Sequence, residues 1–164
     1  MSHHIDTDWI LLVVRIAVAI VMLYYGQRKI RNLRSNANDF VQMGFRPGIM
    51  WGTLIAIVEF FGGIALLIGF YAELAAALFA FQMMVGTFWK LKVRKPFSDY
   101  SYDILLFALC LVVMSQGAGL YSLRSFPGAI FLRWDVAVAS LAGASLLALS
   151  SRPRQNNSAE TAAA

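Results

Sequence analysis

The residue best placed to do chemistry in this chain is Glu59, an acid in the middle of an apolar run from Gly48 to Phe70. A run of this length and polarity predicts a helix that crosses a lipid bilayer. A charged carboxylate at the centre of such a helix costs roughly 3 kcal/mol on insertion scales. It must therefore be protonated, paired with a cation, or turned towards a polar cavity. Glu59 is our candidate catalytic residue, as an acid or base.

Arg15 is another ionisable side chain in apolar surroundings, in a run that begins at Trp9. Counting from Trp9 places Arg15 about 9 Å into the bilayer, and counting back from Phe70 places Glu59 about 16 Å below the same face. An extended guanidinium bridges this difference, so we predict an Arg15–Glu59 ion pair. Asp135 lies about 9 Å deep if the last apolar segment also spans, and it would then join the pair.

The elements that position these residues follow from the composition. The 164 residues are 59% hydrophobic and 14% charged, with a mean hydropathy of +0.64. Soluble domains carry about 25% charged residues, so we predict an all-α polytopic membrane bundle over residues 1–150. The polar, then Ala-rich tail 151–164 is predicted to be disordered. The expected spans are 9–26, 50–71, 74–89, 104–121 and 129–149.

The fifth of these segments is interrupted by Arg133 and Asp135, so it either spans or lies in the interface. Charge placement favours a span. Basic residues gather in the loops 27–48 and 90–102 and in the tail after 150, whereas the connection after the fourth span carries only Arg124. The positive-inside rule then predicts cytoplasmic basic loops and an N-terminus outside. We expect a multi-pass protein of the plasma (inner) membrane.

Individual residues argue against a signal peptide, a metal or haem site, and a dithiol relay. Asp6 and Asp8 precede the first apolar run where a signal peptide has Lys or Arg, so that run is expected to be a retained helix. His3 and His4 stand alone on the N-terminal arm, so no metal or haem site is predicted. Cys110 is a single thiol inside an apolar run, which excludes a dithiol relay.

The basic cluster 90–95 lies beside a span, where orientation and anionic-lipid contact explain it, so the lipid bilayer rather than nucleic acid is the expected partner. Trp and Tyr near the span ends are typical of interfacial anchors. Trp51 has a second interpretation, as a residue that stacks on a bound ligand.

Three short motifs follow one another between residues 11 and 123. The first span contains Arg15 and then Gly26-Gln-Arg-Lys29, and the second contains Glu59-Phe-Phe-Gly62-Gly63 followed by Gly69. The fourth closes with Gly117-Ala-Gly119-Leu-Tyr-Ser122-Leu123. Together they resemble the DoxX family of small bacterial and archaeal membrane proteins. Arg124 departs from that pattern, because the family often has an acid there, and the fifth segment extends beyond the usual core.

The resemblance implies a four-helix membrane bundle with a short, partly helical element between the first two helices. Here that element is 38–44, and its Phe40, Val41 and Met43, with Phe45 after it, are expected on the bilayer surface. Family members have been linked to quinone-coupled sulfur oxidation and to oxidative-stress complexes.

The resemblance implies that the chain is the membrane subunit of a quinone-linked redox or oxidative-stress complex. Glu59 would act as acid or base, with Arg15, Lys29, Trp51 and Asp135 binding the quinone. The chain offers no cofactor ligands of its own, so a partner subunit would supply the electrons. The alternative is a non-enzymatic scaffold or assembly factor whose buried charges only fix helix register. A solute transporter is disfavoured by the short loops and the lack of an internal repeat. A homo-oligomer remains open.

Overall fold

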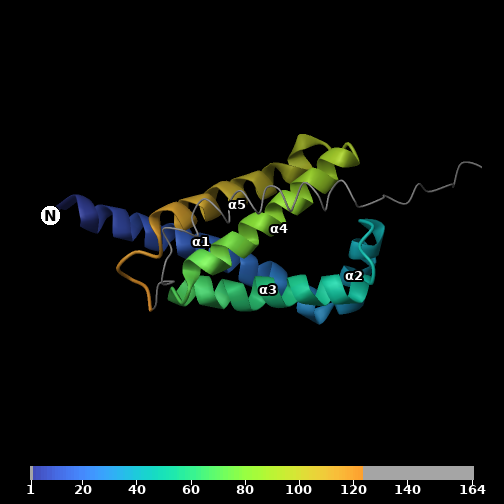
Figure 1. Cartoon of the computed structure of the whole chain (residues 1–164), viewed down its shortest axis with the longest axis horizontal. Coiled ribbons are helices and arrows are strands. Elements are labelled where there is room, and N and C mark those ends of the chain that lie inside the picture. Colours follow the sequence, from blue (N-terminus) through green and yellow to red (C-terminus); the bar gives the residue numbers. More distant parts are fainter. Residues whose placement is uncertain (1, 124–164) are drawn as a thin grey trace, which may run out of the picture.

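The computed structural model describes residues 2–123 and confirms the predicted all-α membrane bundle (Figure 1). Over this range, four helices are long and apolar enough to cross a membrane. The predicted fifth span 129–149, the tail 151–164 and Asp135 lie outside the described residues. The helices are α1 (Ser2–Arg31), α2 (Leu33–Gln42), α3 (Gly48–Ile68), α4 (Ala72–Lys92) and α5 (Phe97–Gln116).

The four long helices run alternately up and down. α1 packs against α3, α3 against α4, α4 against α5, and α1 also contacts α5. The connection through α2 and the turn between α4 and α5 therefore lie at one end of the bundle, on the right of Figure 1. We call this the basic end, because it collects Arg28, Lys29, Arg31, Arg34, Arg46, Lys90, Lys92, Arg94 and Lys95. We call the other the Arg15 end.

The side chains are distributed as expected for a lipid solvent. The bundle interior contains fully buried Val18, Leu66 and Phe79, while bulky apolar side chains such as Ile20 and Phe61 are exposed on the outside. A soluble protein rarely presents so continuous an apolar surface, whereas hydrocarbon solvates it without cost. The outer face is therefore a lipid-facing surface.

Glycine brings α1 and α3 together backbone to backbone. A Cβ built on Gly26 would lie 2.6 Å from the backbone nitrogen of Phe60, and one on Gly63 would lie 2.9 Å from Cγ of Leu23. Neither position has room for a side chain unless the helices separate. Small residues at membrane helix contacts allow this close approach, because van der Waals packing replaces the hydrophobic effect there.

The α4 helix approaches its neighbours differently at its two ends. Its first half contains the buried alanines Ala72, Ala75, Ala76, Ala77 and Ala80. Figure 1 shows α4 close to α3 at the Arg15 end and diverging from it towards the basic end. At the basic end α2 lies beside α3.

Helix ends differ from the hydropathy-based spans for local reasons. α1 continues through Gly26 to Arg31, because a glycine packed against α3 need not end a helix. α5 begins at Phe97, directly after Pro96, although polar residues in its first turns placed the predicted span at 104. It ends before Gly117, whose φ of 84° favours glycine. α2 begins at Leu33, earlier than the expected element 38–44.

We expect Gly26→Ala to destabilise the bundle by about 1–3 kcal/mol, because the new methyl group meets α3 backbone that cannot move aside. Thermal unfolding in detergent would measure the loss. Gly86→Ala is the matched control, since its Cβ would first meet a side-chain oxygen of Asp103, at 3.3 Å. Equal losses for the two variants would show that the α1–α3 contact is looser than described.

Candidate functional site

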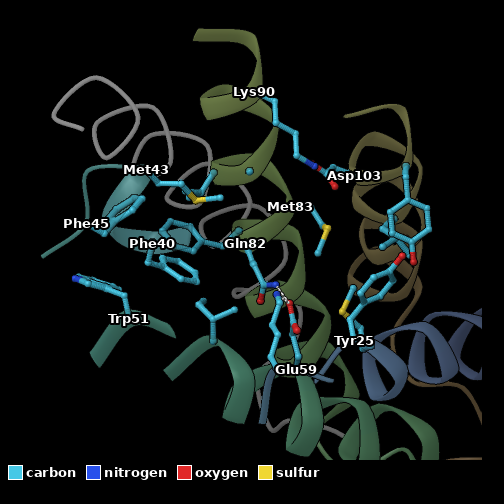
Figure 2. Close-up of a pocket in the computed structure, with 18 of the residues that line it drawn as sticks. Tyr25, Phe40, Met43, Phe45, Trp51, Glu59, Gln82, Met83, Lys90 and Asp103 are labelled. Carbon is cyan, nitrogen blue, oxygen red and sulfur yellow. Dashed lines mark hydrogen bonds and ion pairs between the residues drawn. The ribbon is translucent and has the colours of Figure 1, made fainter. Parts of the chain in front are cut away.

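A cavity of about 440 Å³ lies between the helices towards the basic end (Figure 2). Its volume is in the range of small-molecule sites. Residues from all five helices and from the α2–α3 connection line it. Its apolar wall is mainly aromatic and thioether, with Tyr25, Phe40, Phe45, Trp51, Phe81, Tyr102, Met22, Met43 and Met83. Its polar wall consists of Lys29, Glu59, Gln82, Lys90, Asp99 and Asp103.

Glu59 is the most buried ionisable group of the cavity wall, at 2% exposure. Its Oε1 accepts a hydrogen bond from Lys29 Nζ at 2.5 Å and another from Gln82 Nε2. Figure 2 shows the Glu59 and Gln82 side chains pointing towards one another from α3 and α4. Within the described part of the chain, Glu59 Oε2 and Gln82 Oε1 are buried without a hydrogen-bond partner. One oxygen of Glu59 is therefore engaged twice, whereas its other oxygen and that of Gln82 have no partner.

The helices position this cluster through their inward faces. Glu59 belongs to a stripe of buried residues along α3, with Gly52, Ala56, Gly63 and Leu66. These positions recur at spacings of three and four residues, so they share one face of the helix. The acid is held inside because its neighbours on that face are small or apolar and pack in the bundle interior.

Lys29 reaches Glu59 because α1 stays helical beyond Gly26, where the two backbones touch. Lys29 lies about one turn past that contact, so its long side chain extends along α3 to the carboxylate. Its side chain remains 29% exposed. The lysine therefore directs its ammonium group inwards to a buried acid, while part of its side chain remains accessible.

A second ion pair lines the cavity nearer the basic end. Lys90 Nζ donates to Asp103 Oδ2 at 2.6 Å and to the Asp99 carbonyl at 3.0 Å. This pair joins the last turn of α4 to the first turns of α5. Tyr102, the neighbour of Asp103, lies with its ring centroid 5.9 Å from that of Tyr25 on α1. Two phenol groups thus face the same cavity.

Arg15 lies at the opposite end of the bundle and is fully buried. Its guanidinium donates to the carbonyls of Leu66 at 3.2 Å, Leu67 at 3.4 Å, Ala118 at 2.5 Å and Tyr121 at 3.1 Å. The last carbonyls of a helix have no partner within it, so Arg15 caps α3 and fastens the segment after α5 to it. This is a structural arrangement in which the donors of Arg15 point at backbone.

Glu73, on α4, is the acid at the Arg15 end. It is buried, and its Oε1 accepts a hydrogen bond from the Ala118 amide at 3.1 Å. Arg15 binds the carbonyl of the same residue, so the two charges are linked through one peptide segment. The described residues contain no carboxylate within 4.0 Å of Arg15. Backbone dipoles therefore carry most of its stabilisation.

The sequence profile of the DoxX family matches residues 10–91, half of the chain, from the first turns of α1 to the last turn of α4. The chain belongs to the DoxX family. No protein of curated function and no solved structure matches it. The matched region of this DoxX protein contains Arg15, Lys29, Glu59 and Gln82, so the resemblance drawn from short motifs is confirmed.

The predicted Arg15–Glu59 pair is wrong for this DoxX protein. Arg15 binds carbonyls near the end of α3, about two turns or 11 Å along the helix from Glu59. Unsatisfied carbonyls at the helix end hold the guanidinium there. Lys29, which the sequence analysis placed in the binding site, is the cation that Glu59 uses. Asp135, the predicted third member, lies outside the described residues.

Other predicted residues do converge on the cavity. Trp51 lines it, and its ring contacts that of Phe45 with centroids 5.6 Å apart. Phe40, Met43 and Phe45 were expected on the bilayer surface, but they form part of the cavity wall instead. The α2 segment is turned inwards because Asn36 donates to the Gly52 carbonyl of α3 at 2.6 Å.

Gln82 and the Lys90–Asp103 pair were missed. Gln82 is an amide in the apolar run 74–89, so the argument applied to Glu59 also applies to it, with a smaller cost of burial. Lys90 and Asp103 stand at span ends, where charge is ordinary. Their participation depends on the antiparallel contact of α4 with α5.

We expect Lys29→Met to destabilise this DoxX protein by about 3 kcal/mol, because it leaves Glu59 charged and unpaired in the bundle. The double variant Lys29→Met/Glu59→Gln should recover most of that loss, because no charge then remains to be compensated. Denaturant unfolding of both single variants and the double variant would measure the coupling. The matched control is the Arg15→Met/Glu59→Gln cycle, which should be additive within about 0.5 kcal/mol. Strong coupling in the control cycle alone would contradict the assignment of partners.

Proposed function

We propose that this protein is the membrane subunit of a quinone-linked redox complex, and that its cavity holds the quinone head group. One observation carries the proposal: a cavity with aromatic and thioether walls, inside a membrane bundle, has an ion-paired carboxylate in its polar wall. A quinone has a flat apolar ring and polar oxygens at its edge. Such a ring is complementary to stacking surfaces such as Trp51 and Phe45 combined with a few polar groups.

The polar wall has the groups that quinone chemistry uses. Reduction of a quinone to its hydroquinone adds two electrons and two protons, and the protons go to the two oxygens. Glu59 would take up or release a proton at the oxygen facing it, and Lys29 would stabilise negative charge there. In this proposal a partner subunit supplies the electrons, and the chain binds and orients the ring.

The sidedness of the site belongs to the same proposal. The positive-inside rule places the basic end in the cytoplasm of a cell bounded by a plasma membrane, with the N-terminus outside. The cavity then opens in the cytoplasmic half of the bilayer, where protons for the reaction come from the cytoplasm. Lys90 and Asp103 lie between the Glu59 cluster and that face.

A second candidate is a scaffold or assembly factor, alone or as a homo-oligomer. The contact that favours it is the pairing of Lys29 with Glu59, which joins α1 to α3 and would fix helix register without any ligand. The two candidates differ in one property, whether the cavity binds a quinone.

Trp51→Leu should weaken binding of a quinone by about tenfold, because a stacking surface of the cavity is lost. Equilibrium dialysis of a decyl-chain benzoquinone against the protein in lipid nanodiscs would measure this. Phe61→Leu is the matched control, since Phe61 is 60% exposed on the outer face and does not line the cavity. The affinity of this variant for the quinone should equal that of the wild type.

The wild-type protein decides between the two candidates. Saturable binding of quinone to the purified protein would support the redox complex. So would quinone and a redox subunit that stay with the protein on gentle purification from native membranes. If neither benzoquinone nor naphthoquinone binds in either redox state, the quinone proposal fails and the scaffold is favoured.

A further inference from the structure

Two hydrogen-bond acceptors on residues of the polar wall are left unsatisfied. Among the described residues that line the cavity, the buried side-chain polar atoms without a partner are Glu59 Oε2 and Gln82 Oε1, and both are acceptors. From this we infer that the cavity binds the reduced, dihydroxy form of its quinone more tightly than the oxidised form. The inference rests on the proposed function and specifies which redox state the site favours.

Glu59 provides the stronger of the two contacts. Its Oε1 is already engaged by Lys29 and Gln82, so a ligand meets the free Oε2. An ionised carboxylate has lone pairs and no hydrogen, and can only accept. A hydroxyl donating to it forms a charge-assisted hydrogen bond, roughly twice as strong as a neutral one.

Gln82 becomes an acceptor because of its neighbour. The carboxylate of Glu59 requires a donor, so the Gln82 amide presents its Nε2 to it. The remaining Gln82 Oε1 is then left without a partner in the described structure. The ion pair therefore sets the orientation of the amide, and the amide adds a second acceptor to the same wall.

An oxidised quinone does not complement these two oxygens, because its carbonyls are acceptors too. Lys29 and Lys90 each hold an acid, Glu59 and Asp103 respectively, and their remaining N–H groups can donate to an oxygen of either redox form. The phenol hydroxyls of Tyr25 and Tyr102 can donate or accept, so they serve both redox forms. The discrimination therefore rests on Glu59 and Gln82.

Preferential binding of the hydroquinone has a consequence for electron transfer. Tighter binding of the reduced form raises the midpoint potential of the bound quinone, by about 30 mV for each tenfold difference in affinity of this two-electron couple. A bound quinone would then accept electrons from a partner subunit more readily than one in the lipid.

The test compares one molecule in two redox states. The wild-type protein in lipid nanodiscs would be titrated by calorimetry, under argon, with a decyl-chain benzoquinone and with its borohydride-reduced hydroquinone. The hydroquinone should bind at least about tenfold more tightly, the effect expected of one charged hydrogen bond. In Glu59→Gln the ratio should fall towards one, because an amide donates as well as accepts.

Glu73→Gln is the matched control. Glu73 is another buried acid with an unpartnered oxygen, but it does not line the cavity, so this variant should keep the wild-type ratio. If Glu59→Gln does not fold because Lys29 is left unpaired, Lys29→Met/Glu59→Gln removes both charges and should give the same loss of preference.

The outcomes separate this inference from the proposed function. If both redox states bind equally, or the oxidised form binds more tightly, the inference is overturned while the quinone site stands. If neither form binds, the quinone site itself fails. A preference that persists unchanged in the folded Glu59 variants would also overturn the inference, because its source would lie elsewhere.

Discussion

The burial of the Glu59 carboxylate is the constraint on which the rest of this bundle depends. Hydrocarbon does not solvate a charge, so the acid needs a cation, and Lys29 Nζ supplies it at 2.5 Å. That pairing requires α1 to stay helical beyond Gly26 and to touch α3 at Phe60. A glycine is therefore needed where the backbones meet, and a lysine about one turn later. The family-like Gly-x-x-Lys segment follows from this single electrostatic requirement.

The two ends of the bundle satisfy buried charge in different ways. At the Arg15 end, guanidinium donors meet backbone carbonyls from α3 and from the segment after α5. Glu59, near the middle of α3, lines the cavity and keeps one buried oxygen without a partner in the described structure. A charge that only holds helices together gains by using every hydrogen bond, whereas a charge that meets a ligand must keep one available. Glu73 at the Arg15 end also keeps an unpartnered oxygen, but it does not line the cavity. The free oxygen and the cavity together make Glu59 the functional candidate, whereas Arg15 is structural.

The sequence was sufficient to predict the membrane bundle and the buried acid of the site. It was not sufficient to predict the partners of that acid, which depend on how the helices pack. Hydropathy fixes which segments are solvated by lipid, and the cost of burying an acid singles out Glu59. Depth along a helix does not fix which way a side chain faces, so Arg15 was assigned to Glu59, although the carbonyls of Leu66 and Leu67 hold it. Gln82 became part of the site only through the antiparallel contact of α4 with α3.

The cavity itself follows from the uneven size of side chains along α4. Its alanine-rich first half packs closely in the core, and the bulkier Gln82 and Met83, which follow along the helix, line the cavity. Asn36 binds the Gly52 carbonyl, which holds α2 against α3, and Phe40 of α2 forms part of the cavity wall. A tight end and an open end are thus built into one helix sequence, and the open end is where the unsatisfied carboxylate lies.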